Sequence, residues 1–143
     1  MNKSIFWSKL DKFVSWSRSL SLSVNLFPQG CCGVQILSII SSEFDLKVSP
    51  RGADLLIVAG PISKKMVPFI KRIYEQMPYP KWVIGFGACA LTGGPFYRSY
   101  AVLKCLDEII PVDFYVSGCP PSFDSLIKAI NMIQEKIRKE KGI

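Results

Sequence analysis

The sequence predicts an open, mostly parallel α/β sheet. Short apolar segments of the kind that form strands alternate along the chain with amphipathic segments of helical period. One apolar run, residues 53–60, is almost continuous and ends at a glycine, as is typical of a central parallel strand covered on both faces. The 143 residues suffice for one domain with a real core. We expect an amphipathic helix within residues 1–20 and a single α/β domain over residues 21–143.

The N-terminal segment has the pattern of an amphipathic helix over residues 2–18. Phe6, Leu10 and Phe13 fall on one stripe, while most of the basic residues lie off it. One interpretation is a helix that packs on its own domain. The other is an interfacial helix that lies on a membrane surface or docks on a membrane-embedded subunit, which would explain the two flanking tryptophans.

Four strands are expected, each an apolar run closed by a turn residue. The first alternates serine with aliphatic side chains and stops at a proline, and the later ones are more uniformly apolar. The segment of residues 43–48 is expected to be a linker or a short strand. The four predicted strands are residues 21–27, 53–60, 81–86 and 112–116.

Helices are expected between and after these strands. The first is apolar enough to be buried and is predicted to begin at Gly33, after the loop of residues 28–33. The second follows a proline and a serine and is broken by Pro78. The last is amphipathic and ends in a run of basic residues. The predicted helices are residues 34–41, 63–76, 100–106 and 124–139.

Three glycine-containing loops, each directly after a predicted strand, carry four cysteines. Cys31 and Cys32 are adjacent in the first loop, Cys89 lies in the second and Cys119 in the third. Because the carboxyl ends of parallel strands meet at one edge of a sheet, we expect these four sulfurs to meet there. The fifth cysteine, Cys105, has no glycine or proline beside it, and we expect it to be a small apolar residue and not a ligand.

Composition limits the classes of function. The chain is 49% hydrophobic and 20% charged, which is apolar for a free soluble domain, so partners are expected to cover part of its surface. No run approaches the roughly 20 apolar residues of a membrane span, and a signal peptide is not expected. The net charge is +7, and no histidine is present to serve as general base or zinc ligand. The basic residues are spread out without a nucleic-acid-binding motif, so a membrane or partner surface is the better interpretation.

Four thiolates at one place admit two kinds of metal site. A disulfide framework is disfavoured, because five cysteines and no signal peptide do not fit a small secreted scaffold. Zinc is possible, but structural zinc sites usually present their cysteines as C-x-x-C pairs, and adjacent cysteines suit one ion poorly. An iron–sulfur cubane has four irons facing different directions, so neighbouring thiolates can each take one. A zinc-stabilised interaction module without redox chemistry is the alternative.

Several long motifs around these cysteines are spaced along most of the chain. They are Cys31-Cys32, Ser49-Pro50-Arg51-Gly52, Tyr74-Glu75-Gln76-Met77-Pro78, Pro80-Lys81-Trp82, Gly87-Ala88-Cys89-Ala90 with Gly93-Gly94, and Ile110-Pro111-Val112-Asp113 leading to Gly118-Cys119-Pro120-Pro121. In this order they closely resemble the B subunit of respiratory complex I, a family related to the small subunits of energy-converting [NiFe] hydrogenases and similar membrane-bound oxidoreductases. The resemblance runs from about residue 21 to residue 133.

The resemblance implies a flavodoxin-like α/β fold that carries one [4Fe–4S] cluster, the last of an electron relay, on Cys31, Cys32, Cys89 and Cys119. It implies an oxidoreductase subunit of the NADH:quinone type without a complete active site of its own, in an ion-translocating respiratory complex. The implied partners are a large subunit that contains the acceptor site, a ferredoxin-like iron–sulfur subunit and membrane-embedded subunits. The implied location is peripheral, on the cytoplasmic or matrix-equivalent face of the membrane.

The resemblance also bears on the electron acceptor. Paired cysteines favour the quinone-reducing branch of the family, since hydrogenases usually have C-x-x-C in the first motif. A small subunit of a membrane-bound hydrogenase or of a sulfur-reducing complex is the alternative. This chain has Gln35 where complex I members typically carry a glutamate, and its loop before Ser49 is short. Arg51 is expected either to favour the reduced cluster or to pair with Asp54, which could itself couple protonation to reduction.

Overall fold

The computed structural model describes residues 9, 10, 13, 17, 22–43 and 46–140 of the chain. The predicted N-terminal helix over residues 2–18 lies largely outside these residues; the four that are described there are helical. Among the described residues, no helix combines the length and the apolar character that crossing a membrane would require.

The sheet has four parallel strands in the order β1-β2-β3-β4. They are β1 (Val24–Pro28), β2 (Leu55–Ala59), β3 (Trp82–Phe86) and β4 (Phe114–Val116). At the free edge of β1, Leu46 forms a single parallel bridge with Val24. In chain order Leu46 therefore stands where a second strand of one residue would be. Counted as a strand, it makes the chain order 2-1-3-4-5, which is the order of flavodoxin-like folds. The predicted fold class is confirmed.

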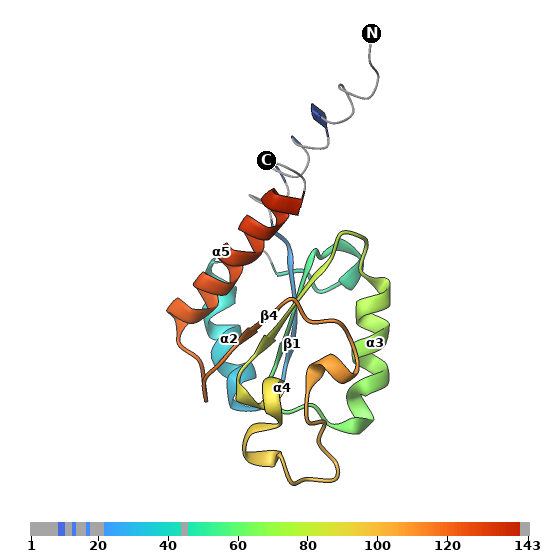
Figure 1. Cartoon of the computed structure of the whole chain (residues 1–143), viewed down its shortest axis with the longest axis vertical. Coiled ribbons are helices and arrows are strands. Elements are labelled where there is room, and N and C mark those ends of the chain that lie inside the picture. The colour runs from blue at the N-terminus through green and yellow to red at the C-terminus, as the bar shows by residue number, and fades with distance from the viewer. Residues whose placement is uncertain (1–8, 11–12, 14–16, 18–21, 44–45, 141–143) are drawn as a thin grey trace.

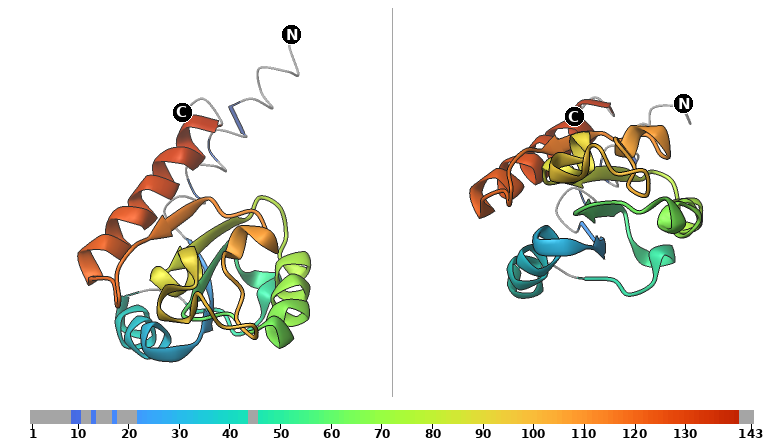
Figure 2. Two further views of the ribbon diagram at one scale, coloured as in Figure 1. Left: turned by 60° about the horizontal axis from the view of Figure 1, so that its bottom comes forward. Right: turned by 90° about the horizontal axis from the view of Figure 1, so that it is seen from below.

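Helices cover both faces of the sheet (Figures 1 and 2). One face packs on α2 (Gly30–Glu43) and α5 (Phe123–Glu140), and the other on α3 (Val67–Gln76) and the short turn η4 (Leu106–Glu108). The side chains of β2 alternate between the two cores, and all five are buried. Burial on both faces explains why this strand is a continuous apolar run.

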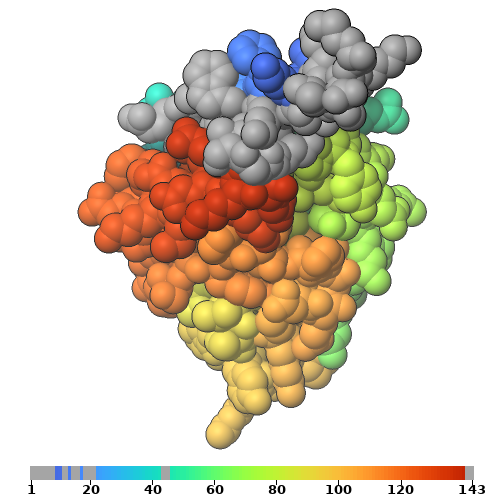
Figure 3. Space-filling model, turned by 45° about the horizontal axis from the view of Figure 1, so that its top comes forward, coloured from blue at the N-terminus to red at the C-terminus, as the bar shows by residue number. Residues whose placement is uncertain are grey.

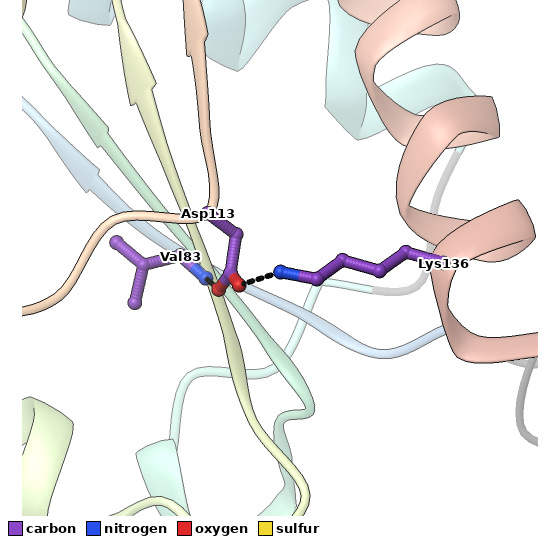
Figure 4. Close-up of polar contacts among 3 residues, drawn as sticks. All are labelled: Val83, Asp113 and Lys136. Atoms are coloured by element: carbon purple, nitrogen blue, oxygen red, sulfur yellow. Dashed lines mark hydrogen bonds and ion pairs between the residues drawn. The ribbon is translucent and has the colours of Figure 1, made fainter. Parts of the chain in front are cut away.

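A polar link ties the last helix to the sheet (Figure 4). The carboxylate of Asp113, just before β4, accepts a hydrogen bond from the Val83 backbone N–H at 3.0 Å and one from the Lys136 ammonium at 2.6 Å. The backbone N–H of Asp113 donates in turn to the Val83 carbonyl at 3.0 Å. One side chain therefore joins β3, the start of β4 and α5.

Three predicted elements differ from the structure. Helix α2 begins at Gly30 and not at Gly33, so the cysteine pair lies in its first turn, and Cys89 lies in a short helix, α4 (Ala88–Thr92), that was expected to be a loop. Residues 100–106 are not a helix. Their backbone is held against the segment before α3 by hydrogen bonds from Lys64 to Ala101 at 2.9 Å and from Leu103 to Ile62 at 2.7 Å. This tertiary pairing overrides the local helical pattern.

Candidate functional site

The loops at the carboxyl ends of the four strands are tied together by their backbones. Each strand end donates a hydrogen bond to the next strand or to the loop after it, so the tie runs across the whole edge of the sheet. These bonds join Gln29 to Ala59 (2.9 Å), Gly60 to Phe86 (3.3 Å), Gly87 to Val116 (2.8 Å) and Ala88 to Gly118 (2.9 Å). All three cysteine-bearing loops are positioned by this series.

The cysteine pair opens α2, which begins directly after β1. The Gly33 N–H donates to the Gln29 carbonyl at 3.0 Å and closes the first turn. Adjacent residues on a helix point about 100° apart, so the two thiols diverge. Cys32 is turned into the core between α2 and the sheet and is 1% exposed, whereas Cys31 is exposed.

The other two cysteines come from the ends of β3 and β4. Cys89 lies in α4 and is buried, whereas Cys119 follows β4 and is exposed. The four thiols are near enough to affect one another. Burial, followed by the neighbouring thiols of Cys31, Cys89 and Cys119, raises the pKa of Cys32 to about 11 from an ordinary 9.0. Burial and then the Cys119 and Cys31 thiols raise the pKa of Cys89 as well.

Two glycines leave room for the buried sulfurs. A Cβ placed on Gly87 would lie 2.7 Å from the Cys32 sulfur, and one on Gly94 would lie 3.0 Å from the Cys89 sulfur. Both glycines also have positive φ, of 98° and 50°. The sequence showed glycines beside the cysteines, but not which of them contact sulfur.

Cys105 is placed differently from the other four cysteines. Its sulfur lies 3.4 Å from the hydroxyl of Tyr115, whose ring packs against the core on the α3 face. Burial, followed by this contact with Cys105, raises the pKa of Tyr115. The structure thus provides Cys105 with a local partner.

Two residues expected near the site lie at the far end of the sheet. Arg51 is in the turn η1 (Pro50–Gly52), and Asp54 immediately precedes β2. Both are at the amino end of β2, whereas the cysteines lie beyond the carboxyl ends of the strands. Neither is placed to act directly on a group held by the four thiols.

Gln35 is a feature of the site region that sequence reasoning noted only as a departure from the family pattern. Its carbonyl oxygen, Oε1, is buried and has no hydrogen-bond partner within the described part of the chain. Helix side chains lean toward the N-terminus, so Gln35 leans toward the turn of Cys31 and Cys32, one turn away. A buried polar atom without a partner is uncommon, and this one belongs to a residue one helical turn after the cysteine pair.

The donor set at this edge of the sheet is four thiols, two of them buried and two exposed. Among the described residues, no group of three or more Cys, Asp or Glu side chains that could hold a metal ion is found. A cubane distributes its four thiolates over four irons and so holds them farther apart than a single ion does. Buried thiols of raised pKa need nearby cations to become thiolates, and glycines without side chains leave space at the sulfurs. The residues present therefore fit a [4Fe–4S] cluster.

A family model described as NADH ubiquinone oxidoreductase, 20 kDa subunit, matches residues 23–133. The chain belongs to this family. The predicted resemblance is confirmed, and the chain is a member of a family of oxidoreductase subunits.

Solved structures give the same fold. An archaeal membrane-bound sulfane sulfur reductase, described as a respiratory membrane complex, contains a chain that is 30% identical, with a TM-score of 0.84 over 90% of this chain and 76% of that one. The reduced, active [NiFeSe] hydrogenase of Desulfomicrobium baculatum is 17% identical, with a TM-score of 0.59 over 78% of this chain and 61% of that one. The H2-activated form of the same hydrogenase is 18% identical, with a TM-score of 0.58 over 82% and 63%. At this identity the hydrogenases show the shared fold alone.

Proposed function

We propose that this chain is the electron-transfer subunit of a membrane-bound respiratory oxidoreductase related to complex I. In this proposal Cys31, Cys32, Cys89 and Cys119 hold the terminal [4Fe–4S] cluster, from which electrons pass to a quinone at the interface with a large subunit. The observation that carries the proposal is the gathering of these four thiols, two of them beside glycines that leave room at sulfur. A ferredoxin-like subunit supplies the electrons, membrane-embedded subunits anchor the assembly, and the chain lies peripherally on the cytoplasmic or matrix-equivalent face.

The chain's own residues position and insulate the cofactor. When bound, a cubane supplies one-electron transfer at a potential set by charge, burial and hydrogen bonds to sulfur. Cys32 and Cys89 are buried and fix one side of the site to the core. Cys31 and Cys119 are exposed and mark the side that a partner covers. The chain has no histidine, so the protons for a reduced quinone come from partner residues.

A sulfur compound is the second candidate acceptor. The observation that favours it is the match to the sulfane sulfur reductase, which extends over most of both chains. The same thiol arrangement would serve this reaction, because the acceptor is bound by the partner and not by this chain. A hydrogenase-like role is less favoured, since those matches show the fold alone.

The cluster is tested by low-temperature EPR of the dithionite-reduced native complex, prepared anaerobically. We expect a cubane signal that is lost or altered in Cys89→Ser and unchanged in the matched control Cys105→Ser. Metal analysis of the same samples gives the independent readout, with iron lost in the first variant only. Stoichiometric zinc and no variant-sensitive signal would instead support the structural zinc module.

The acceptor is tested by mixing the reduced complex with a short-chain ubiquinone or with polysulfide and freezing the samples rapidly. If quinone is the acceptor, we expect the EPR signal of the reduced cluster to be lost within one turnover when quinone is added, and to persist when polysulfide is added. Reoxidation by polysulfide only would replace quinone with a sulfur acceptor and leave the electron-transfer role intact.

A further inference from the structure

The segment after α4 projects from the surface of the molecule (Figure 3). It starts at Gly94, whose backbone packs against the Cys89 sulfur, and passes through the turn η3 (Gly94–Phe96). Its far end is held by the backbone bonds of Ala101 and Leu103 to the segment before α3. The loop is therefore anchored at both ends and presents its side chains on a preformed surface.

A basic, aromatic pocket lies between this loop and the segment it is anchored to. It has a volume of about 470 Å³, and its polar lining includes Lys64, Arg98, Lys104 and Glu108. Tyr97 and Tyr100 line it too and are 56% and 90% exposed. The Lys104 ammonium lies 5.2 Å from the centre of the Tyr97 ring, which orients this cation without neutralising it.

The charges of the pocket do not balance. Three cations stand against one described acid, and no salt bridge joins any of them to Glu108 among the described residues. Exposed tyrosine and arginine are the side chains most enriched where proteins bind one another. Small-molecule sites differ from this pocket, since they bury most of their ligand in a mainly apolar cavity.

We propose that this pocket, defined by Lys64, Arg98, Lys104, Tyr97 and Tyr100, receives an acidic segment of another subunit of the complex. Carboxylates of that segment pair with the three cations, and the aliphatic parts of its acidic side chains pack on the two tyrosine rings. The loop that carries Tyr97, Arg98 and Tyr100 begins at Gly94, beside the Cys89 sulfur, so a partner held in the pocket is bound by the same loop that contacts the cysteine site. The proposal rests on the proposed membership of a complex and is independent of the cluster.

The test is zero-length crosslinking of the native complex with a water-soluble carbodiimide, followed by peptide mass spectrometry. This reagent joins a lysine only to a carboxylate in contact with it. We expect links from Lys64 or Lys104 to aspartate or glutamate of another subunit. Lys71 on α3 and Lys139 on α5, which are exposed lysines outside the pocket, are expected to give no such links. An Arg98→Gln variant keeps both lysines and is expected to lower the yield of the links.

Stability to salt gives a second readout. The double variant Lys64→Gln/Lys104→Gln is expected to leave the complex at lower salt than the wild type, because ion pairs at an interface are screened. The matched double variant Lys71→Gln/Lys139→Gln is expected to behave as the wild type does. Both variants change exposed side chains and retain the EPR signal of the reduced complex if the proposed function holds.

Several results would overturn this proposal. They are the absence of intersubunit links from Lys64 and Lys104, links only to Glu108 of the same chain, or unchanged salt stability of the pocket variant. If the pocket lysines instead governed flotation of the complex with phosphatidylglycerol vesicles and formed no intersubunit link, the pocket would be a lipid-headgroup site. A retained EPR signal in any of these cases leaves the proposed electron-transfer function standing.

Discussion

Gly87 and Gly94 each present a backbone without a Cβ to a cysteine sulfur, Gly87 to Cys32 and Gly94 to Cys89. A methyl group at Gly87 would have to displace the Cys32 sulfur, which is held in the core by packing. Gly52, in the turn η1, offers a matched control, because nothing lies within 4 Å of a Cβ placed there and its φ is not positive.

We predict that Gly87→Ala strongly reduces the iron content of the purified complex. The backbone at Gly87, with φ 98° and ψ 159°, lies in a region essentially confined to glycine and costs an L-residue on the order of 1–3 kcal/mol. The contact with Cys32 adds overpacking of about 1–3 kcal/mol. Gly52→Ala is expected to leave iron content unchanged. Iron per chain and the EPR spectrum of the reduced sample measure the effect, and a wild-type spectrum from Gly87→Ala would show that this sulfur contact is unimportant.

Single residues also show where sequence reasoning stops. Cys31, Cys32, Cys89 and Cys119 could be selected because each follows an apolar strand, and parallel strands end at a common edge. The division into buried and exposed thiols could not be predicted, since it depends on the first turn of α2 starting three residues earlier than expected. The unpartnered Gln35 carbonyl likewise depends on packing around the helix, which no local pattern records.

Elements were predictable where the pattern is continuous. The run that became β2 and the amphipathic period that became α5 both match the structure to within two residues at nearly every end. The predicted helix over residues 100–106 is wrong for a physical reason. This segment pairs with residues 62–64, far from it in the sequence, and its backbone forms its hydrogen bonds there. A short helix such as α4 carries too few residues to show a period.

At the scale of elements, Asp113 joins two strands and a helix through two hydrogen bonds (Figure 4). We predict that Asp113→Asn lowers the free energy of unfolding by about 1 kcal/mol at neutral pH. The asparagine keeps an acceptor for the Val83 N–H, so the loss reports the ion pair with Lys136, whose side chain is 38% exposed. Urea unfolding of the wild type, Asp113→Asn, Lys136→Met and the double variant gives the coupling energy.

The pH dependence of this link has a defined sign. The hydrogen bond that the Lys136 ammonium donates to the Asp113 carboxylate raises the pKa of Lys136 above its ordinary 10.5. The stabilisation is therefore fully present below pH 10.5 and is lost as pH rises through the higher pKa of the folded state. The difference in stability between wild type and Asp113→Asn is expected to shrink above that pH. A constant difference across the alkaline range would mean that the pair contributes no net stability.

At the scale of the whole molecule, the sequence predicts the architecture better than it predicts the distribution of side chains on the surface. The alternation of strands and helices predicts the parallel sheet, and the apolar composition predicts surfaces that partners cover. Large apolar side chains are indeed exposed on several elements, among them Val34, Leu37, Phe69, Phe96, Phe123 and Met132. The positions of these side chains cannot be predicted from composition. They depend on which faces of the helices stay exposed once the helices have packed on the sheet.

The fold and the cofactor site are only partly dependent on one another. The backbone bonds across the strand ends use no cysteine thiol, and of the four candidate ligands only Cys32 belongs to one of the two cores. This differs from small zinc modules, whose binding free energy is their folding free energy. Removal of the metal should therefore loosen the cysteine loops more than the sheet.

We predict that oxidative removal of iron with ferricyanide and a chelator lowers the midpoint of thermal unfolding but leaves the far-UV circular dichroism largely intact. After reduction of the iron-depleted chain with dithiothreitol, alkylation is expected to modify exposed Cys31 and Cys119 first. Cys32 and Cys89 are expected to react slowly, because both are buried and their raised pKa leaves little of the reactive thiolate. Mass spectrometry of a time course gives the order. Collapse of the dichroism, with all four thiols reacting together, would mean that the cluster holds the sheet as well as the loops.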